Sequence, residues 1–187
     1  HATATANEDY WGRAPHLDEY IYKVVPDSSA GIQQLRTGEI DWFPGVPGAS
    51  VQDLEGEDVE VAVAESLSFS FYGYNMDAEK TPLFQEPAVR QALLYALDRE
   101  AMIDAISEGY ATVAIGTMPL LSWAYNPDGI ENDYAYDPDP ARELLDEAGW
   151  AEGSDGVREK DGERLAFSMY ADSSSPSASA YVTAMQE

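Results

Sequence analysis

A helical pattern in which Arg90 is the only charged residue from 87 to 97 constrains the fold of this strongly acidic chain more than any other feature. Residues 84–110 read FQEPAVRQALLYALDREAMIDAISEGY. Apolar residues recur there at spacings of three and four, which predicts one apolar helix face: Val89, Ala92, Leu93, Ala96 and Leu97. The whole chain has 35 acidic and 10 basic residues, a formal net charge of -25. A helix with so little charge in such a chain is expected to bury that face inside a folded body.

Start and stop signals divide this stretch into two helices and place other elements around it. Pro87 suits a first helical turn, Asp98 is expected to cap a second helix, and Gly109 is expected to end it. Aromatic and β-branched alternation predicts strands, whereas residues 117–136 are expected to form a long ordered loop. The expected strands are 17–25, 40–43, 59–64, 69–74 and 165–170. Further helices are expected after a cap at residues 27–29, from Ser50, over 137–148 and from about Ala178. The segment DGVREKDGE (155–163) contains two Asp-Gly pairs and predicts turns around a connector.

The acidic residues are spread along the whole chain, and this pattern has two interpretations. One is adaptation to concentrated salt, in which carboxylates stay hydrated and their repulsion is screened. The other is a binding surface for cations or cationic partners. The even spread favours the first interpretation, an acidic halophilic protein. Either way, the charge repels nucleic acid phosphates and anionic membranes, so no nucleic acid partner is expected.

Composition excludes several kinds of chemistry. The chain has no cysteine and two histidines, His1 and His16. Thiol catalysis, thiolate metal sites and a histidine-based triad are therefore not expected, and neither is a cofactor or a metal site. No apolar run is long enough to span a bilayer, and the start HATATANEDYWG lacks the apolar segment of a signal peptide. We expect no enzyme, although paired carboxylates in a hydrolase and an acidic interaction module remain alternatives.

The aromatic residues offer the best candidate site. In FSFYGYN, residues 69–75, strand alternation puts Phe69 and Phe71 on one face, where they are expected in the core. Tyr72 and Tyr74 lie on the other face beside Asn75, and they either fill the core or line a cleft. Trp123 and Tyr125 lie in the Pro/Asn-rich loop. Tyrosine, tryptophan and asparagine together suit a flexible, partly apolar ligand whose backbone needs hydrogen bonds.

The order of motifs resembles the family 5 extracellular solute-binding proteins of ABC importers, which include oligopeptide, dipeptide and nickel-type binding proteins. The resemblance runs from about Asn7 to Glu187. The motifs that carry it are NEDYWGRAPHLDEYIYKVVPD, LRTGEIDW, SFSFYGYNMDAEKTPLFQEPAVRQALLYALDRE, MPLLSWAYNPDG and YDPDPARELLDEAGW. One departure is Gln85-Glu86-Pro87, which stands where the family often has paired aspartates.

The resemblance implies an α/β fold of the periplasmic-binding-protein type II kind, present here as a fragment. Residues 1–66 would belong to the first lobe and residues 67–187 to the start of the C-terminal lobe. The implied function is capture of a peptide or other small solute between lobes and its delivery to ABC importer permease subunits, as one step of transmembrane transport. The protein would work outside the cytoplasm, at the cell surface or in the periplasm, held to the membrane only by an anchor outside this fragment. The ligand-facing residues would be Tyr72, Tyr74, Asn75, Trp123 and Tyr125.

The charge leads to a first testable prediction. If the acidic surface is an adaptation to salt, repulsion among carboxylates should destabilise the fold when screening is weak. We expect the thermal midpoint of the intact protein, followed by circular dichroism, to rise as sodium chloride increases from about 0.1 M to about 1 M. An equal concentration of sucrose, which adds no ions, is the control. A midpoint that does not change with salt would contradict the prediction.

Overall fold

A computed structural model describes residues 1–54, 56, 58–173 and 175–186 of the chain, and it divides them into two compact units. Unit 1 runs from His1 to Val61 and unit 2 from Ala62 to Glu187. The division lies close to the boundary expected at residues 66 and 67. The assignment of the two units to two lobes stays a prediction.

Unit 1 combines a two-stranded hairpin with two helices. Strands β1 (Ala2–Thr5) and β2 (Glu19–Tyr22) pair antiparallel, with Ala2 opposite Tyr22. Helix α1 (Ser28–Arg36) follows, and Asp27 caps it by accepting a hydrogen bond from the amide of Ala30. Helix α2 is Gly48–Leu54, so the expected helix near Ser50 exists but begins two residues earlier. The cap and the strand after residue 17 confirm local predictions from the sequence.

The small core of unit 1 depends on close packing at one glycine. Ile32 and Leu54 are buried. A methyl group placed on Gly31 would lie only 2.4 Å from the ring of Phe43, so only glycine lets that ring approach α1 so closely. The segment around Phe43 therefore packs on the helix and does not form the expected strand over 40–43.

Unit 2 is built around helix α3 (Pro87–Tyr95), which follows the short 3-10 helix η1 (Pro82–Gln85). Its buried cluster consists of Leu83, Phe84, Val89 and Trp150. Val89 is fully buried. Burial of each such side chain stabilises the fold by about 1.5–3 kcal/mol. Of the apolar face predicted from the sequence, Val89 and Ala92 are buried and Leu93 packs against the cluster, whereas Ala96 is exposed. The buried part of this face is the centre of the unit, which explains why the helix has so little charge.

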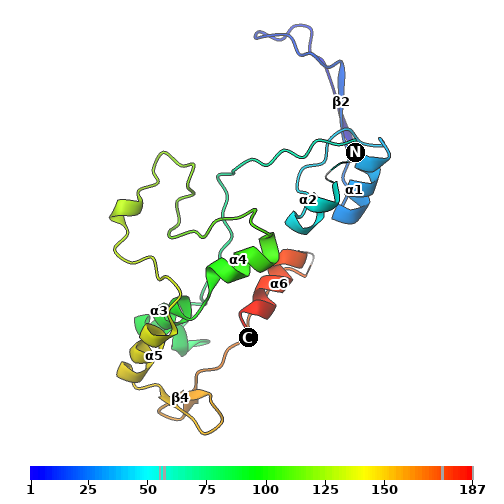
Figure 1. The fold of residues 1–187 in the computed structure, drawn as a ribbon. Coiled ribbons are helices and arrows are strands. Elements are labelled where there is room, and N and C mark those ends of the chain that lie inside the picture. Colours follow the sequence, from blue (N-terminus) through cyan, green and yellow to red (C-terminus); the bar gives the residue numbers. More distant parts are fainter. Residues whose placement is uncertain (55, 57, 174, 187) are drawn as a thin grey trace. The chain divides into compact units, whose positions relative to one another are not determined.

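The other helices of unit 2 form two pairings, α5 with α3 and α6 with α4 (Figure 1). Helix α4 (Arg99–Ser107) is capped by Asp98 as expected, and α5 (Pro138–Glu147) packs against α3. Small side chains at Ala92 and Ala141, both buried, suit this close helix contact. Helix α6 (Pro176–Ala184) packs on α4, where the hydroxyls of Ser107 and Tyr181 lie 2.9 Å apart.

The end of α5 delivers Trp150 into the core. Gly149 has a φ of 87°, a left-handed conformation that glycine adopts without strain. Its amide donates to the carbonyl of Asp146, and the Trp150 amide donates to the carbonyl of Leu145. These two bonds form a Schellman motif, which reverses the chain and turns the next side chain inward. Trp150 is accordingly 2% exposed.

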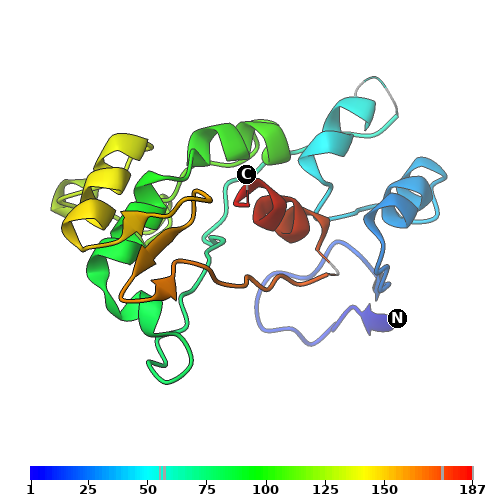
Figure 2. The same ribbon diagram turned by 90° about the horizontal axis from the view of Figure 1, so that it is seen from below.

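A three-stranded meander covers this tryptophan. Strands β3 (Ala151–Glu152), β4 (Arg158–Lys160) and β5 (Glu163–Arg164) pair antiparallel in that order, beside α3 and α5 in Figure 2. Both turns contain the predicted Asp-Gly pairs. The segment between them is a strand, so the expectation of a plain connector was wrong. Asp161 and Gly162 both have positive φ, as the tight turns that match strand twist require.

A half-buried ion pair joins the meander to the start of α3. Lys160 Nζ lies 2.7 and 2.8 Å from the two carboxylate oxygens of Glu86 and 5.7 Å from the centre of the Trp150 ring. The indole nitrogen of Trp150 donates to the same carboxylate at 3.3 Å. We name these three residues the Glu86 cluster. The cluster gives a role to Glu86 in the sequence Gln85-Glu86-Pro87, which differs from the paired aspartates common in the family. Its carboxylate bonds to Lys160 and Trp150, and it does not cap α3.

Three expected strands in and around unit 2 are also absent from the described residues. Residues 59–64, 69–74 and 165–170 form no strand ladder there. A strand is defined by hydrogen bonds to a neighbouring strand, and the described residues supply no such neighbour. The pattern of apolar residues predicts an extended backbone but not its partner.

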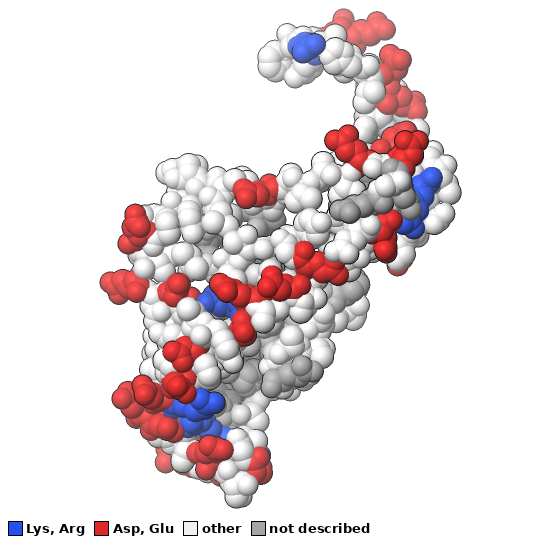
Figure 3. All heavy atoms as spheres, in the orientation of Figure 1, with Lys and Arg blue, Asp and Glu red and all other residues white. Residues whose placement is uncertain are grey.

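Charge and apolarity of the surface follow the composition. Figure 3 shows many acidic side chains and few basic ones over the face in view. Several large apolar side chains of unit 2 are exposed as well, among them Phe71, Trp123 and Tyr170. Within the described residues, no helix combines the length and the apolarity that crossing a membrane requires.

The Glu86 cluster leads to a second prediction. Lys160→Met keeps the packing on Trp150 but leaves the Glu86 carboxylate without its cation. We expect the free energy of unfolding to fall by about 1–3 kcal/mol in urea titrations. The matched control is Lys80→Met, because the pair between Lys80 and Asp77 is exposed and should contribute less than about 1 kcal/mol. Equal losses in the two variants would show that the cluster does not stabilise the fold.

Candidate functional site

The first part of the candidate site is the segment that contains Tyr72, Tyr74 and Asn75, just before η1. The Tyr74 ring packs on Phe84 with the ring centres 4.9 Å apart, and its hydroxyl donates to the carbonyl of Arg90 at 3.2 Å. The Tyr72 ring meets the Tyr74 ring edge-on at 5.5 Å. Helix α3 therefore holds both tyrosines in place.

The two hydroxyls differ in their partners. That of Tyr74 is bonded to the helix, whereas that of Tyr72 is buried and has no hydrogen-bond partner among the described residues. Burial raises the pKa of both phenols above its usual value, and the neighbouring Tyr72 raises that of Tyr74 further. The neighbouring Tyr74 and then the positive charge of Arg99 lower the pKa of Tyr72, but burial outweighs both. Both tyrosines are therefore neutral hydrogen-bonding groups at physiological pH.

The segment does have two distinct faces, as its alternating pattern predicts, but the prediction that Phe69 and Phe71 lie in the core was wrong. Phe69 is 42% exposed and Phe71 is 79% exposed, whereas Tyr72 and Tyr74 are half-buried. Tyr74 packs against the core cluster because its ring contacts Phe84 and its hydroxyl donates to the carbonyl of Arg90. A sequence pattern of period two separates two faces but cannot say which one meets the core.

Asn75 shapes the backbone beside these rings. Its side-chain oxygen accepts a hydrogen bond from the amide of Asp77, which is an Asx turn. The Thr81 hydroxyl donates to the backbone carbonyl of Asn75, and the Gln85 amide donates to the carbonyl of Met76. The side-chain NH₂ of Asn75 remains exposed and can donate to a ligand.

The second part of the candidate site is a long excursion between α4 and α5, residues 114–134, which we name the Trp123 loop (Figure 1). As predicted, it is ordered by local turns, including the 3-10 helix η2 (Pro127–Gly129). The amide of Ser122 donates to the carbonyl of Pro119, and that of Tyr125 donates to the carbonyl of Ser122. Trp123, between these turns, is 98% exposed, whereas Tyr125 is half-buried.

The structure brings some of the predicted residues together and leaves the others separate. Tyr72, Tyr74 and Asn75 form one local group on α3. Among the described contacts, none joins Trp123 or Tyr125 to that group. The joint role of all five residues in one cleft stays a prediction.

Sequence reasoning missed one residue that supports the second part. Arg99, the first residue of α4, donates hydrogen bonds to backbone carbonyls at both ends of the Trp123 loop. A signal was available in the sequence. A cation at the start of a helix opposes the helix dipole, so one of only ten basic residues at that position needs another reason.

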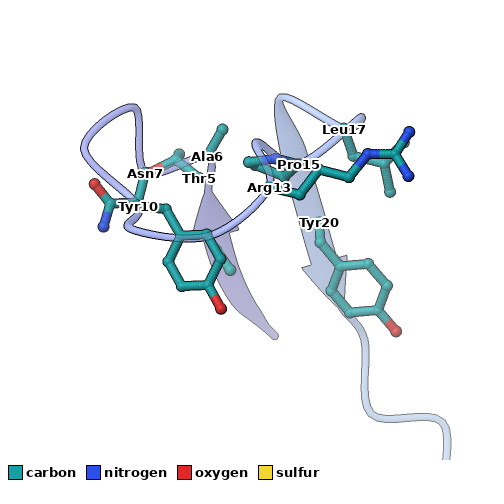
Figure 4. Close-up of a pocket in the computed structure, with 9 residues that line it drawn as sticks. Thr5, Ala6, Asn7, Tyr10, Arg13, Pro15, Leu17 and Tyr20 are labelled. Carbon is teal, nitrogen blue, oxygen red and sulfur yellow. The ribbon is translucent and has the colours of Figure 1, made fainter.

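Unit 1 contains a separate open pocket with a volume of about 380 Å³ (Figure 4). It lies in the β1–β2 hairpin and its long connection. The residues that line it are Ala4, Thr5, Ala6, Asn7, Tyr10, Arg13, Pro15, Leu17 and Tyr20. None of the predicted ligand residues lies there. Groups of three or more possible metal ligands are absent from the described residues of both units.

Two solved structures resemble this chain in both sequence and fold. One is the oligopeptide-binding protein AppA from Bacillus subtilis in complex with a nonapeptide, with a TM-score of 0.70 and 36% identity over 87% of this chain and 32% of that one. The other is NikZ from Campylobacter jejuni in complex with Ni(L-His), with a TM-score of 0.75 and 27% identity over 98% of this chain and 36% of that one. These matches confirm the expected α/β fold of the periplasmic-binding-protein type II kind.

Comparisons with curated relatives and with a family sequence profile agree with this fold assignment. AppA is 36% identical over 166 residues, and the dipeptide-binding protein of Escherichia coli K12 is 32% identical over 149 residues. They match 88% and 79% of this chain, which spans only 30% and 27% of their lengths. The family described as bacterial extracellular solute-binding proteins, family 5 Middle, matches residues 1–187. The chain therefore belongs to the family 5 extracellular solute-binding proteins.

Proposed function

We propose that the protein containing this chain captures a peptide or similar small solute outside the cytoplasm and delivers it to the permease subunits of an ABC importer. The observation that carries this proposal is family membership over the entire chain, with peptide-binding relatives at up to 36% identity over more than three quarters of it. Lobe closure around the ligand would change the surface that the permease contacts. A membrane anchor would lie outside these residues.

Some of the candidate residues would contact the ligand directly, and others would also hold the site in place. Trp123 is free of contacts that would occupy its ring, since it is 98% exposed, and the buried Tyr72 hydroxyl lacks a described partner. Each is suited to a ligand: the indole to apolar side chains, and the hydroxyl to an amide once ligand binding exposes it. Asn75 and Tyr125 would add hydrogen bonds. Tyr74 would contact the ligand with its ring edge while its hydroxyl remains on α3.

The family function can be tested directly. The intact protein would be titrated by isothermal calorimetry with synthetic dipeptides, tetrapeptides and nonapeptides, and separately with Ni(L-His). We expect saturable binding of at least one peptide class and recovery of that peptide unchanged by mass spectrometry. Cleavage of the peptides would instead support a hydrolase, and binding abolished by about 1 M salt would support an acidic interaction surface.

Trp123 gives a third prediction. Trp123→Ala should raise the dissociation constant of the best-bound peptide by about tenfold or more, because a buried tryptophan contact contributes at least about 1.4 kcal/mol. The thermal midpoint should hardly change, because the free side chain contacts solvent. The control is Tyr170→Ala, a 94% exposed aromatic outside the candidate site. Unchanged affinity with a large loss of midpoint would show that Trp123 is structural.

The two tyrosine hydroxyls give a fourth prediction, in which each variant controls for the other. Tyr74→Phe removes the bond to the Arg90 carbonyl and should lower the free energy of unfolding by about 1 kcal/mol. Tyr72→Phe removes a hydroxyl without a described partner, so stability should stay the same or rise. If that hydroxyl binds ligand amides, Tyr72→Phe should weaken peptide binding. Denaturant titration and calorimetry on both variants measure the two effects, and reversed stability effects would contradict the assignment.

A further inference from the structure

One arginine side chain bonds to both ends of the Trp123 loop. Arg99 Nη1 donates to the carbonyl of Ala114 at 3.3 Å, where the loop begins. Its Nη2 donates to the carbonyls of Asp133 and Tyr134 at 2.7 and 2.5 Å, where the loop ends. One guanidinium therefore joins the two ends of the loop. We name these ends, around residue 114 and residues 133–134, the neck of the Trp123 loop.

A second set of contacts fixes the far end of the neck to α3. The Tyr134 ring packs on the Tyr95 ring at 5.1 Å, and its hydroxyl accepts from the side chain of Gln91. Asn132 donates to the Tyr95 hydroxyl at 2.6 Å. Tyr134 has a φ of 50°, a strained conformation for a tyrosine, so these contacts hold the backbone where it would not rest alone.

The two sides of the loop also touch just beyond the arginine. A methyl group placed on Gly116 would lie 3.2 Å from the end of the Ile130 side chain, so this side chain spans the gap between the two sides of the loop. Past this contact, the hydrogen bonds described for 117–130 are all within local turns, and Tyr125 is in addition half-buried. The position of these two side chains therefore depends on the neck.

The choice of arginine follows from this geometry. A guanidinium presents five donors in a fixed fork and can bond carbonyls that approach from two sides, whereas an ammonium is a single point of charge on a flexible stem. The cation also lies at the start of α4, where the helix dipole disfavours it. Bonds to three carbonyls offset that unfavourable position.

We propose that Arg99 is a positioning residue, which closes the neck of the Trp123 loop and thereby holds Trp123 and Tyr125 in place for a bound solute. The second half of this inference, the placement of Trp123 and Tyr125 for a bound solute, rests on the proposed function. Its first half, closure of the loop, concerns the free protein and can be tested without any ligand.

The experiment uses Arg99→Lys in the intact protein, which keeps the charge and loses the fork. Hydrogen exchange of the free protein should become at least about tenfold faster in the amides of 115–132, while α3 remains protected. The dissociation constant of the best-bound synthetic peptide should rise by about tenfold, with the loss reduced in an Arg99→Lys, Trp123→Ala double variant relative to the sum of the single effects. The control is Arg142→Lys, because Arg142 forms an exposed pair with Asp139 on α5.

A rescue experiment separates positioning from direct ligand contact. Because the chain has no cysteine, Gly116→Cys and Ile130→Cys introduce a unique pair of thiols across the neck. We expect that joining them with a short bis-thiol crosslinker in the Arg99→Lys background restores both slow exchange and peptide affinity. If Arg99→Lys alone does not fold, recovery of the fold on crosslinking supports the proposal, and continued failure overturns it.

The remaining outcomes are equally decisive. Unchanged exchange in 115–132 overturns closure by Arg99. Faster exchange with unchanged peptide affinity overturns the positioning role, as does lost affinity that the crosslink fails to restore. If the unmodified protein binds no peptide and no Ni(L-His), the proposed function fails, whereas the exchange result still decides whether Arg99 closes the loop.

Discussion

Burial of the α3 face against Phe84 and Trp150 is the constraint on which unit 2 depends. Val89 is fully buried and Trp150 is 2% exposed, and both belong to one buried cluster with Phe84. The Schellman motif at Gly149 sends Trp150 inward, and the meander that follows closes over it. Because Glu86 at the start of α3 bonds both Trp150 and Lys160, the first and last parts of this core are joined by a single carboxylate.

The candidate site uses this core as its support. Tyr74 reaches the Arg90 carbonyl on α3, and Tyr134 reaches Gln91 and Tyr95 on the same helix. A rigid helix thus positions both a short aromatic segment and the end of a long loop, which is how binding groups on loops gain precise placement. The acidic surface is separate from this arrangement, since aromatic rings, hydroxyls and amides make up the candidate site.

Local features were predictable from the sequence because their causes lie within a few residues. Asp27 and Asp98 cap helices by accepting from amides three residues later, and the Asp-Gly pairs form the turns of the meander. The candidate residues Tyr72, Asn75 and Trp123 could be selected by chemistry and by family resemblance. Their exposure could not be predicted, because it depends on which side of the segment meets α3.

The sequence by itself determined the helix caps at Asp27 and Asp98, the tight turns, the burial of one face of α3 and the family. Only the tertiary structure decided that Tyr74 and not Phe71 faces the core, that Glu86 binds Lys160 and that Arg99 closes the Trp123 loop. It also showed that 59–64, 69–74 and 165–170 lack ladder partners among the described residues. The physical reason is range: caps and turns satisfy backbone groups close by in the chain, whereas strand pairing and side-chain-to-carbonyl bonds join residues far apart in sequence.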